Sequence, residues 1–145
     1  MSELSGILSG NFIYDELETS VSGILSSDFS LTSGQILTEN EIPDEDETFF
    51  SRMVWSYGPL QDLSNKCETE ISNLNIEVYE RKNDDEAYII PFVRKLRYVL
   101  KEKLNVKITD STYIKINNIF LTKNINEKEW NSYNVAISFR IINMR

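Results

Sequence analysis

The second half of the chain switches between two hydrophobic periods. Ile76 and Val78 alternate with polar neighbours, which is typical of a strand that buries one face. Farther along, apolar residues recur at spacings of four, three, four and four, which places them on one face of a helix. These residues are Ile89, Val93, Leu96, Leu100 and Leu104. The pattern therefore predicts a strand followed by a helix.

The start of this helix has two possible positions, because Pro91 lies within the pattern. If the helix begins at Asn83, Pro91 removes an interior hydrogen bond and kinks it. If the regular part begins near Tyr88, Pro91 falls in the first turn, where a missing N–H costs nothing.

Two further strands are predicted after the helix. Ile114 and Ile116 follow a period of two, whereas Ile119 and Leu121 fall on the other register. The change of phase at residues 117–118 predicts a β-bulge or a bend. The final strand alternates for ten residues with apolar Tyr133, Val135, Ile137, Phe139 and Ile141, and we expect it to be central in the sheet.

The first 48 residues form an acidic, Ser-rich lead. Ile13, Leu17, Val21 and either Ile24 or Leu25 keep helical spacing, and Asn11 is a candidate N-cap, so a short amphipathic helix is predicted there. An exposed loop should follow around Pro43. The aromatic segment 49–57 should end at the turn signal 58–59.

These elements predict a single α+β domain over residues 1–145, with the lead at 1–48 and an α/β core at 49–145. The sheet should be mainly antiparallel. It should carry one long covering helix after the first strand of the second half and a short helix near the N-terminus.

The composition argues against most enzyme classes. The chain has no histidine, which excludes nucleophiles that depend on a histidine base. Cys67 is the single cysteine, so neither an internal disulfide nor a multi-thiolate metal site can form. We therefore predict a non-enzymatic protein without cofactor or metal. A carboxylate-based enzyme remains an alternative without a motif behind it.

No apolar run approaches the roughly 20 residues that span a bilayer, and the N-terminus does not resemble a signal peptide. A protein without membrane contact is therefore expected.

The net charge of -8 is divided unevenly along the chain. Residues 1–51 hold 11 acids and no Lys or Arg, whereas residues 52–145 hold 12 acids and 15 bases. The two parts should therefore attract each other or different partners.

Four adjacent acids concentrate this charge, namely Asp44, Glu45, Asp46 and Glu47. They are expected either to line a DNA channel or to dock a basic surface of a neighbouring subunit. Asp44 and Asp46 alternate as calcium ligands do, but the glycine turn and the distal glutamate of a calcium-binding loop are missing.

The matching basic surface lies on the predicted long helix. Arg94, Lys95 and Arg97, followed by Lys101 and Lys103, should cover its outer side. We favour a solvated or subunit-facing helix. The alternative is a small nucleic-acid-binding module, because clustered cations contact phosphates.

Two tryptophans are candidate contacts with a second chain. Trp55 lies in the aromatic segment and either packs in the core or anchors a partner subunit. Trp130 lies in a predicted polar hairpin loop over residues 123–132, where core neighbours are few.

The block from residue 76 to residue 142 resembles the tail-terminator and minor tail proteins of tailed bacteriophages. The resemblance rests on a strand that ends in Arg at residues 76–81, an EAY sequence at residues 86–88 that leads into a helix ending at Leu100, a strand at residues 113–116, and a last strand at residues 133–141 with its FRI ending. It covers about half of the chain, and residues 1–73 match less well.

The resemblance implies a structural virion subunit that forms a ring, usually a hexamer. This ring caps the tail tube and joins it to the neck, and genomic DNA passes through it without specific binding. It also implies location in the virion and in the host cytoplasm during assembly. Another connector or baseplate subunit, and an accessory protein of a mobile element, remain alternatives.

Overall fold

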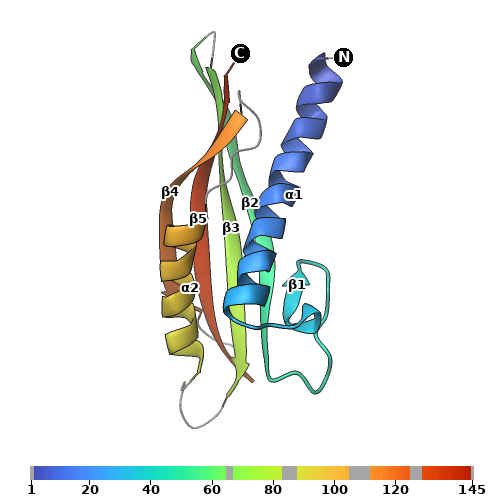
Figure 1. The fold of residues 1–145 in the computed structure, drawn as a ribbon, viewed down its shortest axis with the longest axis vertical. Helices are drawn as coiled ribbons and strands as arrows, with labels where there is room; N and C mark the ends of the chain where they lie inside the picture. The colour runs from blue at the N-terminus through green and yellow to red at the C-terminus, as the bar shows by residue number, and fades with distance from the viewer. Residues whose placement is uncertain (1, 65–66, 83–87, 105–111, 125–128, 145) are drawn as a thin grey trace.

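The computed structural model describes residues 2–64, 67–82, 88–104, 112–124 and 129–144 (Figure 1). Within these residues the chain forms two long helices, one 3-10 turn and five strands. In chain order they are α1 (Ser2–Asp28), η1 (Ser33–Gln35), β1 (Ile36–Thr38), β2 (Phe49–Ser64), β3 (Cys67–Arg81), α2 (Ile89–Lys103), β4 (Thr112–Lys123) and β5 (Trp130–Met144).

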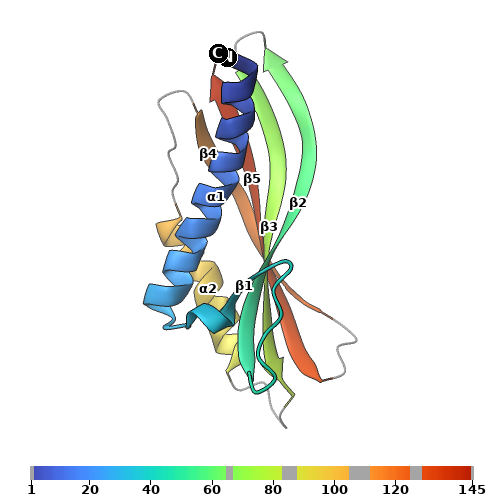
Figure 2. The ribbon, with the colours of Figure 1, turned by 90° about the vertical axis from the view of Figure 1, so that its right-hand side faces the viewer.

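The strands form one sheet in the order β1-β2-β3-β5-β4. β1 is parallel to β2, and all other neighbours are antiparallel. Both helices lie on the same face of the sheet (Figures 1 and 2). We call this the inner face and the opposite one the outer face. The predicted α+β class is confirmed, and so is the central place of β5 between β3 and β4.

The core lies between the helices and the inner face. The part of α1 whose side chains are described, residues 15–28, contributes three fully buried side chains, α2 contributes its apolar stripe, and the central strands contribute alternate residues. The fully buried members include Leu17, Val21, Leu25, Leu74, Ile76, Val78, Ile89, Val93, Leu96, Leu100, Val135, Ile137 and Phe139. Most periodic positions of the predicted helix and strands are thus core positions, while Ile116, Leu121 and Tyr133 are partly buried and pack against this core.

α2 begins at Ile89, so Pro91 is its third residue. The predicted start near Tyr88 is confirmed, and within residues 88–104 the helix continues through Pro91 without a break. The N–H of Phe92, the residue after Pro91, donates to the carbonyl of Tyr88. Pro91 lies in the first turn, where its N–H would have no helical acceptor, so its missing donor costs no hydrogen bond. Residue Asn83 lies outside the described residues.

α1 begins at Ser2, so the predicted N-cap at Asn11 is wrong. Leu17 and Val21 of the predicted stripe are fully buried, and of the two alternatives Leu25 is fully buried whereas Ile24 is partly buried. The side chain of Ile13 lies outside the described residues. Once that stripe is packed, each residue added upstream gains a backbone hydrogen bond at little cost, and no proline precedes it to stop the helix. The N-terminal helix is therefore longer than the hydrophobic pattern indicated.

β2 does not end at Gly58 and Pro59, as the turn signal predicted. The strand continues to Ser64 after a register shift between Tyr57 and Leu60. β1 pairs with β2 only as far as Met53, so β2 is an edge strand at this point. A proline and a bulge are tolerated there because no neighbour needs the missing N–H.

β4 contains the predicted bulge. Its register shifts between Ile116 and Asn118, and Ile114 and Ile119 on either side are both buried. The shift returns the apolar residues of the second half of β4 to the inner face.

In the part of the chain that the structure describes, no helix is both long and apolar enough to cross a membrane.

Candidate assembly interface

The loop between β1 and β2 is held against the outer face by two arginines. The guanidinium of Arg81 donates to the carbonyl oxygens of Glu47 (3.3 Å) and Glu45 (2.9 Å). Arg52 donates to the carbonyl of Glu41 at 3.2 Å. Because both arginines bind the backbone of the loop, they leave its carboxylates available for other partners.

An aromatic cluster supports these arginines. Phe50 is only 4% exposed, stacks on Tyr79 at 4.8 Å and meets Trp130 edge-on at 5.1 Å. The guanidinium of Arg81 lies 4.6 Å from the ring centroid of Trp130, and that of Arg52 lies 5.6 Å from Phe50. Cation–π attraction therefore adds to the hydrogen bonds that fix the loop.

Trp130 was predicted on a polar hairpin loop, which is wrong, since it is the first residue of β5. Its ring is half-buried and contacts Phe50, Tyr79 and Arg81 of the same chain. The structure therefore gives Trp130 an intramolecular role, which is to seat Arg81.

Three adjacent carboxylates, Asp44, Glu45 and Asp46, project from this loop, and we call them the acidic tip. All three are exposed, and within the described residues none forms an ion pair or a side-chain hydrogen bond. A turn in which the N–H of Glu47 donates to the carbonyl of Asp44 (3.0 Å) fixes their backbone. The acidic tip is thus a group of free charges on an ordered support.

Glu47 differs from the tip, although it belongs to the same run of acids. Its carboxylate accepts hydrogen bonds from the side-chain amide of Gln35 (3.1 Å) and from the N–H of Phe49 (3.4 Å). Glu47 therefore has a structural role, and its charge is not free for docking.

The start of the loop is anchored by Glu41. The hydroxyl of Thr38 donates to this carboxylate at 2.7 Å, and the N–H of Thr38 donates at 3.0 Å. The hydroxyl bond and then the backbone bond lower the pKa of Glu41 below its usual value. The group stays ionised at neutral pH, which keeps the start of the loop in place.

The basic side of α2 divides into bound and free charges. Lys103 pairs with Asp28 at 2.7 Å, and this hydrogen bond lowers the pKa of Asp28. Lys95 lies 5.6 Å from the ring centroid of Phe29. Arg94 is exposed and forms no hydrogen bond or ion pair with the described residues, so it is available to a partner.

Arg97 and Arg94 line a groove between α2 and β4, which we call the basic groove. The Nε of Arg97 donates to the carbonyl of Ile119 at 2.8 Å, which holds this side chain against the strand. Residues 118–122 of β4 form the other wall, and the groove has a volume of about 610 Å³. Within the described residues β4 pairs only with β5, so the groove runs along an open edge of the sheet.

Trp55 packs between α1 and the sheet. Its indole N–H donates to the carboxylate of Glu18 at 3.1 Å, and its ring meets Phe139 edge-on at 5.9 Å. These contacts agree with the core-packing alternative for this residue.

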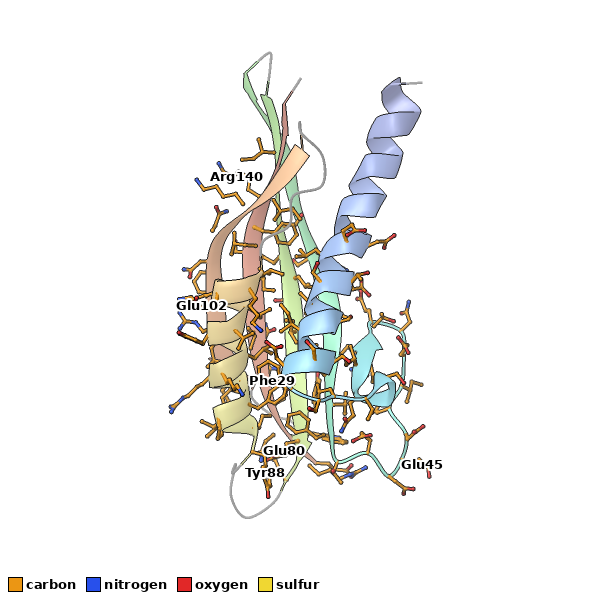
Figure 3. The ribbon with its side chains drawn as sticks, viewed as in Figure 1. Phe29, Glu45, Glu80, Tyr88, Glu102 and Arg140 are labelled. Atoms are coloured by element: carbon orange, nitrogen blue, oxygen red, sulfur yellow. The ribbon has the colours of Figure 1, made fainter. Side chains whose placement is uncertain are left out.

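The acidic tip and the basic groove lie at opposite margins of the molecule. Figure 3 shows Glu45 at one side and α2, marked by Glu102, at the other, with the sheet between them. The strand order gives the same result, because the loop joins β1 to β2 while α2 packs over β3, β5 and β4. Within one chain, the structure does not bring the acids 44–47 to Arg94, Lys95 or Arg97.

Sequence reasoning missed the role of Arg52 and Arg81, although a signal was present. Each arginine follows an aromatic residue by two positions in a strand, as Phe50 and Arg52 do in β2 and as Tyr79 and Arg81 do in β3. Residues two apart share a face of the sheet, so this spacing could have placed both arginines on an aromatic surface.

Replacing Arg81 with alanine is expected to release the loop. The change removes two charge-assisted hydrogen bonds and a cation–π contact, so the free energy of unfolding should fall by about 1–2 kcal/mol. Amide hydrogen exchange of residues 44–48 should accelerate more than exchange in β3. Lys101→Ala is the matched control, because Lys101 is exposed on α2 outside the lining of the basic groove and should change neither quantity. Equal loop exchange in the two variants would contradict this role of Arg81.

Comparison with known proteins adds a fold and no function. No protein-family model matches the chain, and no curated protein sequence does. A solved structure whose name carries no functional description aligns with a TM-score of 0.57 over 88% of this chain and 94% of that chain, at 8% sequence identity. The two chains share a fold, and at this identity the likeness extends no further.

Proposed function

We propose that this chain is a structural subunit of a phage virion that assembles head to tail into a ring. In this role it is a tail terminator or tail-completion subunit that caps the tail tube and joins it to the neck. The resemblance of residues 76–142 to tail-terminator and minor tail proteins supports this role. The ring, by the same resemblance, has six copies and lets genomic DNA pass without specific binding.

The observation that carries the ring proposal is the placement of unlike charges at opposite margins. The loop at residues 39–47 has six acids and no base, whereas α2 has five bases and one acid. A contact between two different surfaces of the same chain leaves one free surface on each end of every complex. Such contacts continue until the assembly closes into a ring or grows as a filament.

A nucleic-acid-binding module has weaker support. Lys103 is paired with Asp28, so one of the five bases on α2 is already engaged by a carboxylate. Fewer free cations mean fewer phosphate contacts and a weaker dependence of binding on salt.

Native mass spectrometry and light scattering at micromolar concentration test the proposal, with and without tail-tube protein. We expect a closed species whose mass is an integer multiple of the chain mass. Tail-tube protein should bind one end of the ring and increase the fraction of chains in this closed species. A strict monomer in every condition would contradict the proposal. Strong salt-dependent binding of duplex DNA by that monomer would favour the nucleic-acid-binding module instead.

A further inference from the structure

We infer that the acidic tip of one copy seats in the basic groove of the next copy. This inference rests on the proposed head-to-tail assembly and names the two surfaces that meet. Asp44, Glu45 and Asp46 enter beside Arg94 and Arg97, along the open edge of β4. The contact repeats at every subunit boundary of the ring.

The groove has the properties of a receiving site for an anionic segment. One arginine is fixed in direction by its bond to the carbonyl of Ile119, and the other is free to follow the incoming carboxylate. The groove is open to solvent along the edge of β4, with a volume of about 610 Å³, so a projecting loop can enter it from outside. Arginine also pairs with carboxylates through two parallel hydrogen bonds, which gives direction as well as attraction.

Exposed apolar side chains lie next to the charged residues on both surfaces. Ile42, two residues before the acidic tip, is 87% exposed, and Phe120 in the wall of the basic groove is 50% exposed. Tyr98, 65% exposed, lies one helical turn beyond Arg94 on the same side of α2. Each surface therefore combines an apolar residue with charge of one sign, and the two signs are opposite. Aromatic and arginine side chains are enriched at the centres of protein interfaces.

A second copy is the occupant that fits, because the tip cannot reach its own groove. The sheet lies between them, with the tip near β1 and β2 and the groove along β4 (Figure 3). The arginines that bind the loop backbone hold the tip in place before docking, so little conformational freedom is lost on association.

Charge reversal on each surface tests the inference. The tip variant carries Asp44→Lys, Glu45→Lys and Asp46→Lys, and it leaves Glu47 and its hydrogen bonds intact. The groove variant carries Arg94→Glu and Thr122→Glu, two exposed positions in the groove, and it leaves the bond of Arg97 intact. Each variant places like charges opposite each other, so the dissociation constant of the assembly should rise at least about 100-fold.

A single chain that carries both sets of changes restores opposite charges and should assemble again. Ile42→Ser, which changes no charge, should weaken assembly about 10-fold by removing the apolar contact. Glu39→Lys is the control, since Glu39 is exposed in the same loop but outside the tip. Circular dichroism melting of each variant shows that the subunit itself remains folded.

The failure of this inference is distinguishable from failure of the ring. If the unchanged protein never assembles, the proposed function fails. If it assembles and the folded tip and groove variants assemble equally well, the ring remains and the tip-to-groove contact is overturned. The contact is also overturned if the combined chain is folded but does not assemble. Tight binding of labelled duplex DNA that Arg94→Glu abolishes would instead identify the groove as a phosphate site.

Discussion

Replacing Ile137 with aspartate is expected to abolish folding. Ile137 is fully buried at the middle of β5, paired with Leu74 of β3 on one side and with Ile119 of β4 on the other. An unpaired carboxylate there would lose its hydration without gaining a partner. Domains are stable by only about 5–15 kcal/mol, so this cost together with the lost apolar burial exceeds what the fold can absorb.

Solubility and thermal melting followed by circular dichroism measure this effect. Ser138→Asp is the matched control, because residue 138 is adjacent in β5 and its side chain points to the outer face. The control should fold and melt cooperatively. A soluble Ile137→Asp variant with a cooperative transition would show that β5 is less central to stability than its place in the sheet indicates.

Replacing Leu25 with alanine is expected to destabilise the whole domain by about 2–5 kcal/mol, the range for large-to-small changes in a core. Leu25 lies in the last turns of α1, is fully buried, and belongs to the same cluster as residues of β3, β5 and α2. The acidic lead is therefore part of the core rather than an appendage. Loss of the Leu25 side chain should therefore destabilise the sheet as well as α1.

Urea unfolding, followed by fluorescence and by far-ultraviolet circular dichroism, measures this change. We expect both signals to shift to a lower midpoint together with little change in slope. Ser26→Ala is the control, because Ser26 is the next residue of α1 and is exposed. Two separate transitions, or an unchanged midpoint for Leu25→Ala, would mean that α1 folds independently of the sheet.

The sequence predicts those parts of the fold that a local period determines. The stripe of α2, the alternation of β5 and the phase change in β4 each involve one face buried against a single core, so spacing alone identifies them. A local hydrophobic period does not determine the start of α1 or the continuation of β2 past Pro59. The first depends on helix propagation beyond the packed stripe, and the second depends on the absence of a neighbouring strand.

Only part of the candidate interface could be predicted from the sequence. The separation of acids from bases along the chain is visible without a structure, but their separation in space depends on the strand order. Placing β5 between β3 and β4 moves α2 and its arginines away from the loop after β1. The hold of Arg52 and Arg81 on backbone carbonyls could not be predicted either, because those bonds join residues 11 to 36 positions apart.

The four acids at residues 44–47 have two different roles in the structure, which are support of the loop and exposed charge. Glu47 supports the loop through Gln35, while Asp44, Glu45 and Asp46 remain exposed. A test that reverses all four acids would mix destabilisation of the loop with loss of docking. Reversing the three exposed acids isolates the charge that a neighbouring copy would meet.

Electron microscopy of the assembled protein, alone and bound to the end of tail tubes, tests the central proposal most directly. We expect class averages that show a closed ring with cyclic symmetry, in which the β1–β2 margin of each copy faces α2 of the next. Particles that remain single subunits, or that form two-fold symmetric pairs through one shared surface, would contradict head-to-tail assembly.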